Sequence, residues 1–549
     1  MKYRILQNKW FLYLTEFFAG VSVMAVELGA SRLLAPYFSS SQIVWTIIIG
    51  VIMIAMALGN LYGGRAADKD PDPARLYRRI LIAAVWIAAI PVAGKYVILG
   101  VSALLVLAIN TNFLIWAAFA SCMIVFVFPL FLLGTVTPCL VRATIESLDE
   151  GGRTVGRLGA CNTIGSIIGT FLPTFVTIPS VGTSVTFLIF AGILLAIALI
   201  FFVSAKWKKP GPYVAAALFV LCVIFGRNGS FAFWQNDLLY EGESVYNYLQ
   251  VSEDSEKVIL STNVLFGVQS VAMKEGGLTG LYYDYALAAP VMAQKSAPSV
   301  LVLGNGTGTF ASQCTRYFPG APVEGVEIDG KITKLAEEYF NLPEEVKVTE
   351  YDGRAYIQTV KEKYDVIMVD AYQDITIPFQ MSTTEFFTLV RDHLTENGVM
   401  VVNLSMHSDG ELSINHYLCD TISSVFPYVA TADVPYTTNR ELFASMKEMP
   451  AVLLEQGRLS SADSASLYGN TEALAAAAAD QADLARMMET VSAVLTPYQA
   501  ENHILTDDKA PVEVLGMRMI DLLISDELSY FKNIFETEGL AGLLKSLGI

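Results

Sequence analysis

The fold of this chain is decided by the stretch SVLVLGNGTGTF, residues 299–310. An apolar run of strand length ends there at a glycine-rich turn, and a helical pattern follows it as far as Tyr317. The next apolar segment ends in VEID, residues 326–329. A buried parallel strand, a glycine turn and an acidic residue at the end of the following strand are typical of α/β sheets that hold a nucleoside. The glycine run alone is equally compatible with a plain turn, so the prediction depends on the rest of the chain.

The composition predicts that part of this protein lies in a membrane. Of its 549 residues, 53% are hydrophobic and only 16% are charged, a balance too apolar for a purely soluble protein. Nearly all long apolar runs precede Gly226, whereas most acidic residues follow it. The net charge of −17 would repel phosphates, so nucleic acid is not an expected partner.

The chain shows no pattern of metal ligands. Its six cysteines are scattered without a CxxC pair, and its four histidines, at positions 393, 407, 416 and 503, lack the spacing of a metal site. We therefore expect neither a disulfide framework nor a bound metal.

Seven apolar stretches are candidates for transmembrane helices. They lie at residues 11–31, 42–62, 79–99, 113–135, 158–179, 183–204 and 212–226, and an eighth segment at 97–109 is an alternative because Lys95 interrupts the third. No clear cleavage site follows the first stretch, so we expect it to be retained. Gly165 and Gly169 predict a face for close helix packing. These features predict a multi-pass protein of the cell membrane, with the lipid bilayer as a partner.

Basic residues predict how the helices are oriented. Lysines and arginines gather in the loops around residues 65–79, 142–157 and 206–209, which share the N-terminal side if all seven stretches cross. Such positive loops mark the cytoplasmic side. Seven crossings then place the C-terminal domain outside the cytoplasm, whereas an even number keeps it inside. The sequence leaves the side of that domain open.

Three parts follow one another along the chain. Residues 1–230 are expected to form the transmembrane helical domain. Residues 231–297 change to short alternating segments, typical of a small layer of about three to five β-strands. Residues 298–549 repeat strands and helices at the spacing of an α/β Rossmann-like domain with a doubly wound sheet.

The expected elements of the Rossmann-like domain can be placed individually. Strands are predicted at residues 299–303, 323–328, 346–350, 365–370 and 398–404. Helices are predicted between them at residues 309–317, 330–340, 353–362 and 383–395. The alanine-rich stretch 463–491 and two C-terminal segments, 517–523 and 531–547, are also predicted to be helical.

Three carboxylates fall at the ends of three predicted strands: Glu327, Asp352 and Asp370. The carboxyl ends of parallel strands meet at one crevice, which is the usual ligand site of an open sheet. Asp352 is also a good helix N-cap, and Asp370 is also compatible with a turn. Because the three follow successive strands behind a glycine loop, we favour a shared site.

Several further runs resemble a single family in their content and in their order. They are GNGTGT (304–309), VEID (326–329), DGR (352–354), YDVIMVDAY (364–372), IP (377–378), TTEFF (383–387) and LTDDKAPVE (505–513). Together they resemble the spermidine synthase (polyamine aminopropyltransferase) family over about half of the chain, and the spans in front resemble its membrane-fused bacterial members. The resemblance implies an S-adenosylmethionine-methyltransferase-like fold. It also implies aminopropyl transfer from decarboxylated S-adenosylmethionine to a di- or polyamine.

The resemblance assigns roles to the residues around the nucleoside. Glu327 would hold the ribose of decarboxylated S-adenosylmethionine, and Asp352 would accept a hydrogen bond from the adenine amine. The other residues expected at the cosubstrate are Gln250, Gln269, Gly304, Gly306, Thr307 and Gly308.

The resemblance also implies a catalytic group of Asp370, Tyr283 and Asp374. The reaction displaces a thioether at the methylene beside a sulfonium, so the amine must be unprotonated and aligned about 3 Å away. Amines of this kind have a reference pKa of about 10.4. Asp370 is therefore expected to orient the amine and accept its proton.

Some residues of this chain differ from the family pattern, and the differences affect the expected binding of the acceptor amine more than that of the nucleoside. Soluble spermidine synthases carry an aspartate in the glycine loop where this chain has Thr307. Their second catalytic aspartate follows the first by three residues, whereas Asp374 follows Asp370 by four, and Tyr283 is followed by Asp284 in place of a common His-Glu pair. These changes leave the identity of the acceptor amine open.

Two other functions remain open at this point. An S-adenosylmethionine-dependent methyltransferase would share the sheet and the nucleoside site. A transporter or polyamine sensor would use the soluble domain to bind without catalysis, with Glu27 as a candidate residue within the spans. Soluble relatives tend to be dimers or tetramers, so the resemblance also implies a homodimer.

Overall fold

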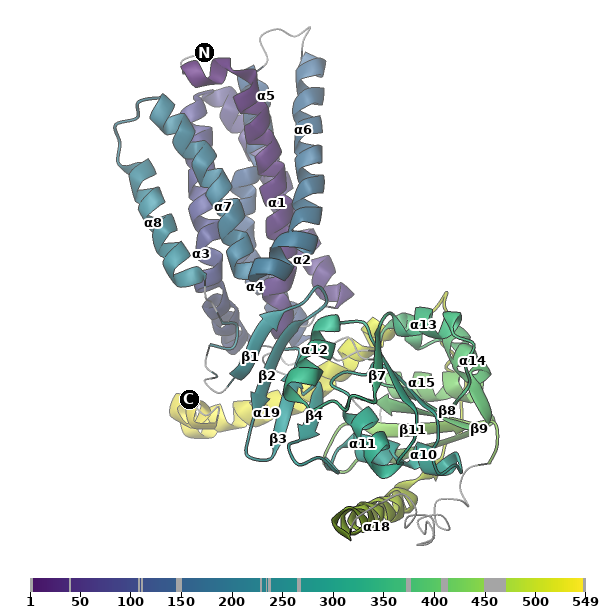
Figure 1. Ribbon diagram of the computed structural model, residues 1–549. Coiled ribbons are helices and arrows are strands. Elements are labelled where there is room, and N and C mark those ends of the chain that lie inside the picture. Colours follow the sequence, from purple (N-terminus) through teal and green to yellow (C-terminus); the bar gives the residue numbers. More distant parts are fainter. Residues whose placement is uncertain are drawn as a thin grey trace.

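A bundle of long helices and an α/β region are stacked end to end in this molecule (Figure 1). The computed structural model describes residues 3–546, except 39–40, 107–108, 110–111, 145–150, 228–229, 234, 236–237, 264–267, 372–376, 406–412 and 449–470. The N-terminus lies at the end of the bundle far from the α/β region (Figure 1).

The bundle is built from apolar helices. They are α1 (Lys9–Phe38), α2 (Gln42–Lys69), α3 (Pro73–Val106), α4 (Phe113–Gly134), α5 (Val136–Thr144), α6 (Gly151–Leu172), α7 (Ile178–Ser204) and α8 (Gly211–Gly226). Five helical stretches are long and apolar enough to cross a membrane: Lys9–Phe38, Gln42–Lys69, Pro73–Val106, Phe113–Thr144 and Gly151–Ser204. The helix α8 is apolar but shorter.

Two details of the bundle bear on the number of crossings. The stretch Gly151–Ser204 runs along α6 and returns along α7 (Figure 1), past Gly182, whose φ of +80° interrupts the helix. The proposed eighth segment is not a separate helix where the structure describes it, because α3 continues to Val106. Lys95 therefore does not end the third helix.

Glycines bring α1 and α6 into close contact. A Cβ atom added at Gly165 would lie 2.1 Å from the carbonyl oxygen of Phe17, and one at Gly169 would lie 2.2 Å from that of Val21. No side chain fits there, so the two backbones approach as small residues allow in membrane helices. The predicted packing face is thus confirmed.

A four-stranded antiparallel sheet follows the bundle. Its strands, in spatial order, are β1 (Leu238–Glu243), β2 (Tyr248–Glu253), β3 (Lys257–Ser261) and β4 (Ser270–Met273). Leu249, Val251 and Leu260 are buried against helix α12 (Gly330–Tyr339) of the α/β region. The small sheet is thereby fixed beside the carboxyl ends of the larger one.

The larger sheet has eight strands in the order β12-β10-β11-β9-β8-β5-β6-β7. They are β5 (Val300–Leu303), β6 (Val323–Glu327), β7 (Lys347–Glu350), β8 (Tyr364–Val369), β9 (Leu394–Leu404), β10 (Tyr428–Asp433), β11 (Arg440–Ser445) and β12 (Thr496–Pro497). The five predicted strands, β5 to β9, are parallel as expected. The sheet is nevertheless mixed and not doubly wound throughout, because β11, β10 and β12 extend it as antiparallel strands.

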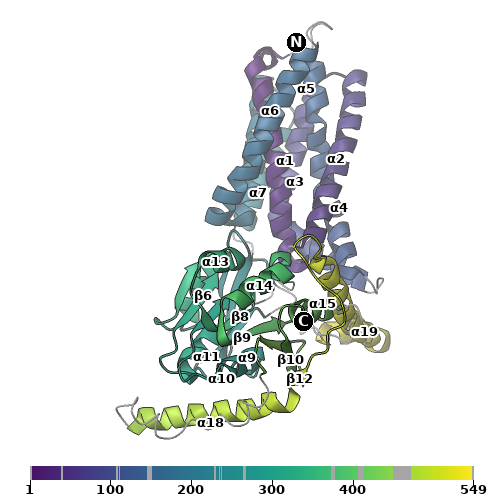
Figure 2. The same ribbon diagram turned by 90° about the vertical axis from the view of Figure 1, so that its right-hand side faces the viewer.

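Helices cover both faces of this sheet. One face carries α9 (Tyr282–Ala286), α10 (Ala288–Met292), α11 (Thr309–Tyr317) and α18 (Thr471–Val494). The other carries α13 (Gly353–Thr359), α14 (Thr384–Asp392), α15 (Ile414–Ser423) and the start of α19 (Val512–Ser546). The short helices α9 and α10 thus pack in the α/β core, although they fall within the segment 231–297 expected to be a β-layer. Further along, α19 runs beneath the bundle (Figure 2).

Candidate active site

A cavity of about 270 Å³ lies at the carboxyl ends of β5, β6, β7 and β8. It is lined by Tyr246, Asn247, Thr262, Gln269, Gly304, Gly306, Val326, Glu327, Ile328, Ile332, Tyr351, Asp352, Gly353, Asp370, Ala371, Pro378, Gln380 and Met381. The crevice at the ends of the parallel strands is therefore open, and it contains all three predicted carboxylates. They share one site as expected.

The glycine loop after β5 makes room for this cavity. Gly304 has a φ of +89°, and a Cβ atom there would lie 2.5 Å from the carbonyl oxygen of Asp370 and 2.7 Å from the nitrogen of Ala371. Only glycine accepts both the conformation and the contact. The loop after β5 therefore packs directly on the loop after β8.

Glu327 is tied to the glycine loop. Its Oε2 accepts from the N–H of Gly306 over 2.8 Å, and its Oε1 accepts from the N–H of Asp329 over 3.0 Å. Burial raises the pKa of Glu327 to about 7, although these two backbone donors oppose the shift. The carboxylate lines the cavity and retains acceptor capacity for a ligand's hydroxyl groups.

Asp352 has two roles in the structure. Its side chain accepts from the N–H of Ala355 over 2.8 Å and so caps α13. It also lines the cavity. The N-cap and the binding-site interpretations of this residue are therefore compatible.

Asp370 lies at the end of β8 between two donors. The hydroxyl of Tyr282 donates to Oδ2 over 2.6 Å, and Nδ2 of Asn403 donates to Oδ1 over 2.9 Å. Burial raises the pKa of Asp370 to about 7, against the lowering effect of these donors. A carboxyl group with a pKa near neutrality can accept and release a proton at physiological pH.

The other predicted site residues divide between the cavity and its surroundings. Gln269, Gly304 and Gly306 line the cavity together with the three carboxylates. The N–H of Thr307 donates to Oγ of Ser270 over 3.4 Å, and Gly308 is the N-cap residue of α11. Among the described residues that line the cavity, neither Thr307 nor Gly308 appears.

Gln250, Tyr283 and Asp374 are not placed at the cavity. Gln250 is buried in β2, where its Oε1 accepts from the hydroxyl of Tyr248 over 3.2 Å. The hydroxyl of Tyr283 donates to the carbonyl of Gln269 over 3.3 Å. Asp374 lies outside the described residues. The roles of these three residues remain predictions.

Asp284, which departs from the family pattern, has a structural role. Its carboxylate accepts from the N–H groups of Thr279 and Gly280 over 3.0 and 2.6 Å, and from Nε2 of Gln313 over 2.6 Å. It joins the segment before α9 to α11. This helps to hold the helix that presents Tyr282 to Asp370.

Sequence comparisons agree with this geometry. Residues 281–456 match the model of the spermine/spermidine synthase domain. The chain is 53% identical over 358 residues to the probable polyamine aminopropyl transferase of Bifidobacterium longum, covering 64% of this chain and 78% of that protein. This chain belongs to the polyamine aminopropyltransferase family. The class of enzyme predicted from the motifs is thereby confirmed.

Other aminopropyltransferases are more distant from this one. The polyamine aminopropyltransferase of Vibrio vulnificus is 24% identical over 306 residues, which cover 54% of this chain and 96% of that protein. Among solved structures, a probable spermidine synthase from Corynebacterium glutamicum aligns with 48% of this chain and 95% of its own, at 20% identity and a TM-score of 0.35.

The sequence analysis of this aminopropyltransferase missed two partners of Asp370. Tyr282 stands next to the tyrosine that the motif singled out, and the direction of its side chain depends on the packing of α9. Asn403 lies in a strand that was predicted, beside Asp370 once β8 and β9 are paired. The parallel register of those strands was the only available signal for Asn403.

The turn between β1 and β2 covers the active site. Tyr246 and Asn247 of this turn line the cavity. Oγ of Ser244 and Nδ2 of Asn247 donate to Oδ2 of Asp329 over 2.5 and 3.1 Å. The turn is thereby held against the end of β6, two residues from Glu327.

The same turn is bound to the helical bundle. The carboxylate of Glu243 accepts from the N–H and the hydroxyl of Thr183 in α7 over 2.8 and 2.6 Å. Arg32 in α1 donates to the carbonyl of Val245. The aminopropyltransferase domain and the bundle are thus joined through one wall of the active site.

The described residues contain no group of three or more histidine, cysteine, aspartate or glutamate side chains placed to hold a metal ion. The acidic groups of the active site are instead held by backbone N–H groups, hydroxyls and amides, as described above.

Proposed function

We propose that this chain transfers an aminopropyl group from decarboxylated S-adenosylmethionine to a primary amine of a di- or polyamine. The observation that carries the proposal is one cavity in which Glu327, Asp352 and Asp370 meet at the ends of adjacent strands. Two of these carboxyl groups suit a nucleoside, and the third suits an amine. The family to which the chain belongs supports the same reaction.

The nucleoside would bind on the side of β6 and β7. Glu327 offers carboxylate oxygens to the ribose hydroxyl groups, and Asp352 offers its free lone pairs to the adenine amine. Tyr351 and Met381 supply apolar surface along the same cavity.

The chemical step would take place beside Asp370. The amine nitrogen forms a bond to the methylene carbon of the aminopropyl group while that carbon's bond to sulfur breaks. The sulfonium becomes a neutral thioether, methylthioadenosine, and the amine's proton passes to Asp370. The hydroxyl of Tyr282 and the amide of Asn403 donate to the carboxylate of Asp370 and hold it in one orientation. The amine would therefore meet its proton acceptor in the same position in each turnover.

Product analysis tests this proposal. The purified full-length protein in detergent is incubated with decarboxylated S-adenosylmethionine and a panel of amines, and in parallel with S-adenosylmethionine. Release of methylthioadenosine together with an aminopropylated amine is the expected result. Release of S-adenosylhomocysteine in the second reaction alone would instead establish a methyltransferase, and binding without either product would favour a sensor.

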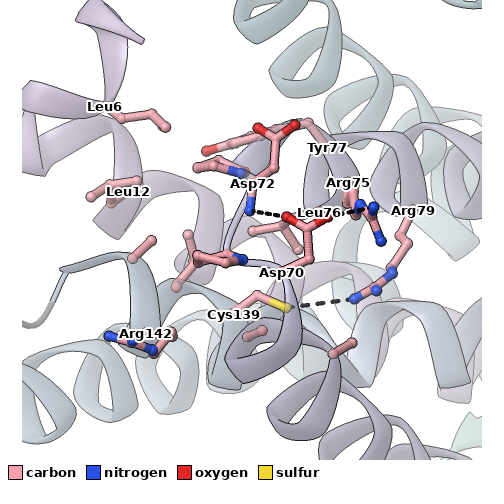
Figure 3. A pocket seen from close by; sticks show the side chains of 16 residues that line it. Leu6, Leu12, Asp70, Asp72, Arg75, Leu76, Tyr77, Arg79, Cys139 and Arg142 are labelled. Carbon is pink, nitrogen blue, oxygen red and sulfur yellow. Dashed lines mark hydrogen bonds and ion pairs between the residues drawn. The ribbon is translucent and has the colours of Figure 1, made fainter. Parts of the chain in front are cut away.

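We also propose that the helical bundle crosses the cell membrane with its N-terminal end in the cytoplasm. Figure 3 shows Arg75, Arg79 and Arg142 gathered at this end around a cavity of about 20 Å³. That volume accommodates about one water molecule, so the cavity is too small for a larger ligand. A position at the membrane surface explains the arginines around it better than a ligand site does. Positive residues favour the cytoplasmic side.

This orientation has a consequence for the enzyme. The α/β region lies at the opposite end of the bundle (Figure 1), so full crossing places it on the other side of the membrane. A second cavity of about 200 Å³ lies between the bundle and the active site and shares Tyr246, Asn247 and Thr262 with the first. Substrates would therefore approach near the membrane surface.

We further propose a homodimer, which the resemblance to soluble members of the family implies.

A further inference from the structure

Helix α7 is interrupted at Gly182, and the interruption leaves donors without partners in the helix. The φ of Gly182 is +80°, so the helical turns that follow begin at Thr183. The first N–H groups of a helix lack acceptors within it, and a carboxylate at this end is also favoured by the helix dipole. An acceptor from outside the helix is therefore needed at Thr183.

Glu243 at the end of β1 supplies this acceptor. One of its carboxylate oxygens accepts from the N–H of Thr183 over 2.8 Å, and the other accepts from the hydroxyl of Thr183 over 2.6 Å. Burial raises the pKa of Glu243, whereas the bonds from Thr183 and the positive charge of Arg32 oppose the shift. Thr183 is only 1% exposed, so bulk water has little access to the contact. The bundle thus holds the charged form of Glu243 at two points.

The turn that follows Glu243 is held together by its own hydrogen bonds. The N–H of Ser244 donates to the carbonyl of Asn247 over 2.8 Å. Oγ of Ser244 accepts from the N–H groups of Tyr246 and Asn247 over 3.0 and 2.8 Å. These bonds keep the residues of the turn in fixed relative positions. A displacement of Glu243 would therefore also displace Tyr246 and Asn247, which line the active-site cavity.

The same turn is connected to the carboxylate proposed to hold the ribose. Ser244 and Asn247 donate to the side chain of Asp329, and the N–H of Asp329 donates to Oε1 of Glu327 over 3.0 Å. Hydrogen bonds thus lead without a gap from Thr183 in the bundle, through the turn, to Glu327. Contiguous networks of this kind can carry energetic coupling between distant sites.

We propose that Thr183 and Glu243 are positioning residues for the cosubstrate, through which the helical bundle fixes the turn over the active site. This inference rests on the proposed aminopropyl transfer and gives the bundle a part in it beyond anchoring. The donors that hold Asp370, on Tyr282 and Asn403, belong neither to the bundle nor to the turn. A loosened turn should therefore weaken binding of the nucleoside and leave the chemical step at Asp370 unchanged.

The experiment removes the hydroxyl of Thr183 with little change in the size of the side chain. Full-length protein in detergent and its Thr183→Val variant are assayed by methylthioadenosine release at varied decarboxylated S-adenosylmethionine, with 1,4-diaminobutane in excess. We expect the KM for the cosubstrate to rise about 3- to 10-fold, because one of two hydrogen bonds to a charged carboxylate is lost. The kcat should stay near that of the wild type. Binding of methylthioadenosine, measured by calorimetry, should weaken by a similar factor.

Further variants keep the test specific. Thr183→Ser retains both donors and should keep the wild-type KM. Thr15→Val removes the hydroxyl of another threonine that is 1% exposed, whose bond to the carbonyl of Phe11 lies within α1, and should leave the KM unchanged. Glu243→Gln leaves one amide oxygen for two donors and should raise the KM at least as much as Thr183→Val. Adding Thr183→Val to Glu243→Gln should then have little further effect, because both changes act on one contact.

Several results would overturn the inference. Equal KM values for Thr183→Val and Thr15→Val, or a loss in Tm alone, would limit the contact to the stability of the bundle. Equal defects in Thr183→Ser and Thr183→Val would exclude the hydroxyl as their cause. Either result, with methylthioadenosine released by the wild type, would leave the proposed function intact. A wild-type protein that neither releases nor binds methylthioadenosine would instead overturn the proposed function, and this inference with it.

Discussion

Replacing Asp370 by asparagine tests the central chemical claim. Asparagine keeps the size of the side chain but cannot accept a proton from the amine. The loss of a positioned general base typically lowers the rate about 10²- to 10⁴-fold. We expect that loss in kcat, with little change in the KM for decarboxylated S-adenosylmethionine, because the proposed nucleoside contacts lie at Glu327 and Asp352.

The pH dependence of the same variant provides a second measurement. Burial raises the pKa of Asp370 to about 7, and the deprotonated carboxylate is the form that accepts a proton. Wild-type kcat/KM for the amine should therefore rise with pH through about 7. The variant should lack this limb, while the rise near pH 10 that belongs to the free amine should remain in both proteins.

Stability should change in the opposite direction with pH. A carboxyl group whose pKa is raised by folding stabilises the protein below its unfolded pKa and loses that contribution as the pH rises to the folded value. For Asp370, whose pKa rises from 3.8 to about 7, the contribution is about 4 kcal/mol. The difference in Tm between Asp370→Asn and the wild type should therefore move in favour of the variant between about pH 4 and pH 7.

A matched variant controls for general damage to the site. Asp352→Asn should weaken binding of the cosubstrate but keep the pH limb near 7. The reasoning would be refuted if Asp370→Asn retained wild-type kcat, or if the limb near pH 7 persisted in Asp370→Asn and disappeared in Asp352→Asn.

Three further predictions follow from the same structure. Glu327→Gln should raise the KM for decarboxylated S-adenosylmethionine about 10- to 100-fold through the loss of charged hydrogen bonds, and an unchanged KM would remove Glu327 from the ribose site. Gly304→Ala should lower Tm more than Gly320→Ala: both glycines have positive φ, but only the first would place a Cβ atom against the loop at Asp370. Reporter proteins fused to the two ends of the chain should show that the N-terminus lies in the cytoplasm and the C-terminus outside it. Fluorescence in cells from green fluorescent protein fused to the C-terminus would contradict the proposed orientation.

Local patterns explain why much of the fold was predictable. The central strands β5 and β8 are short, mainly apolar runs bounded by turns, and the helices between the parallel strands show a 3.6-residue period. Glu327, Asp352 and Asp370 were predicted to meet because the ends of parallel strands converge whatever the detailed packing. The antiparallel strands after residue 404 were missed: β10 and β11 form a hairpin across residues 434–439, and their pairing with β9 and β12 joins segments that lie far apart in the chain.

Other features could not be read from neighbouring residues. The sequence does not show which of the adjacent tyrosines, Tyr282 or Tyr283, reaches Asp370. Only the packing of α9 directs the side chain of Tyr282 toward Asp370. Gln250 was expected at the cavity, but its side chain lies beside that of Tyr248, two residues away on the same face of β2. The contact of Glu243 with Thr183 joins two domains that the sequence presents as separate parts.

By itself, the sequence determined the bundle of apolar helices and the parallel part of the α/β sheet, because apolar periodicity acts over a few residues, and its ordered motifs gave the resemblance to the enzyme family. Only the tertiary structure decided which side chains surround Asp370. The position of Asn403 beside Asp370 depends on the hydrogen-bond register between β8 and β9, and a shift of one residue would turn the side chain of Asn403 to the opposite face.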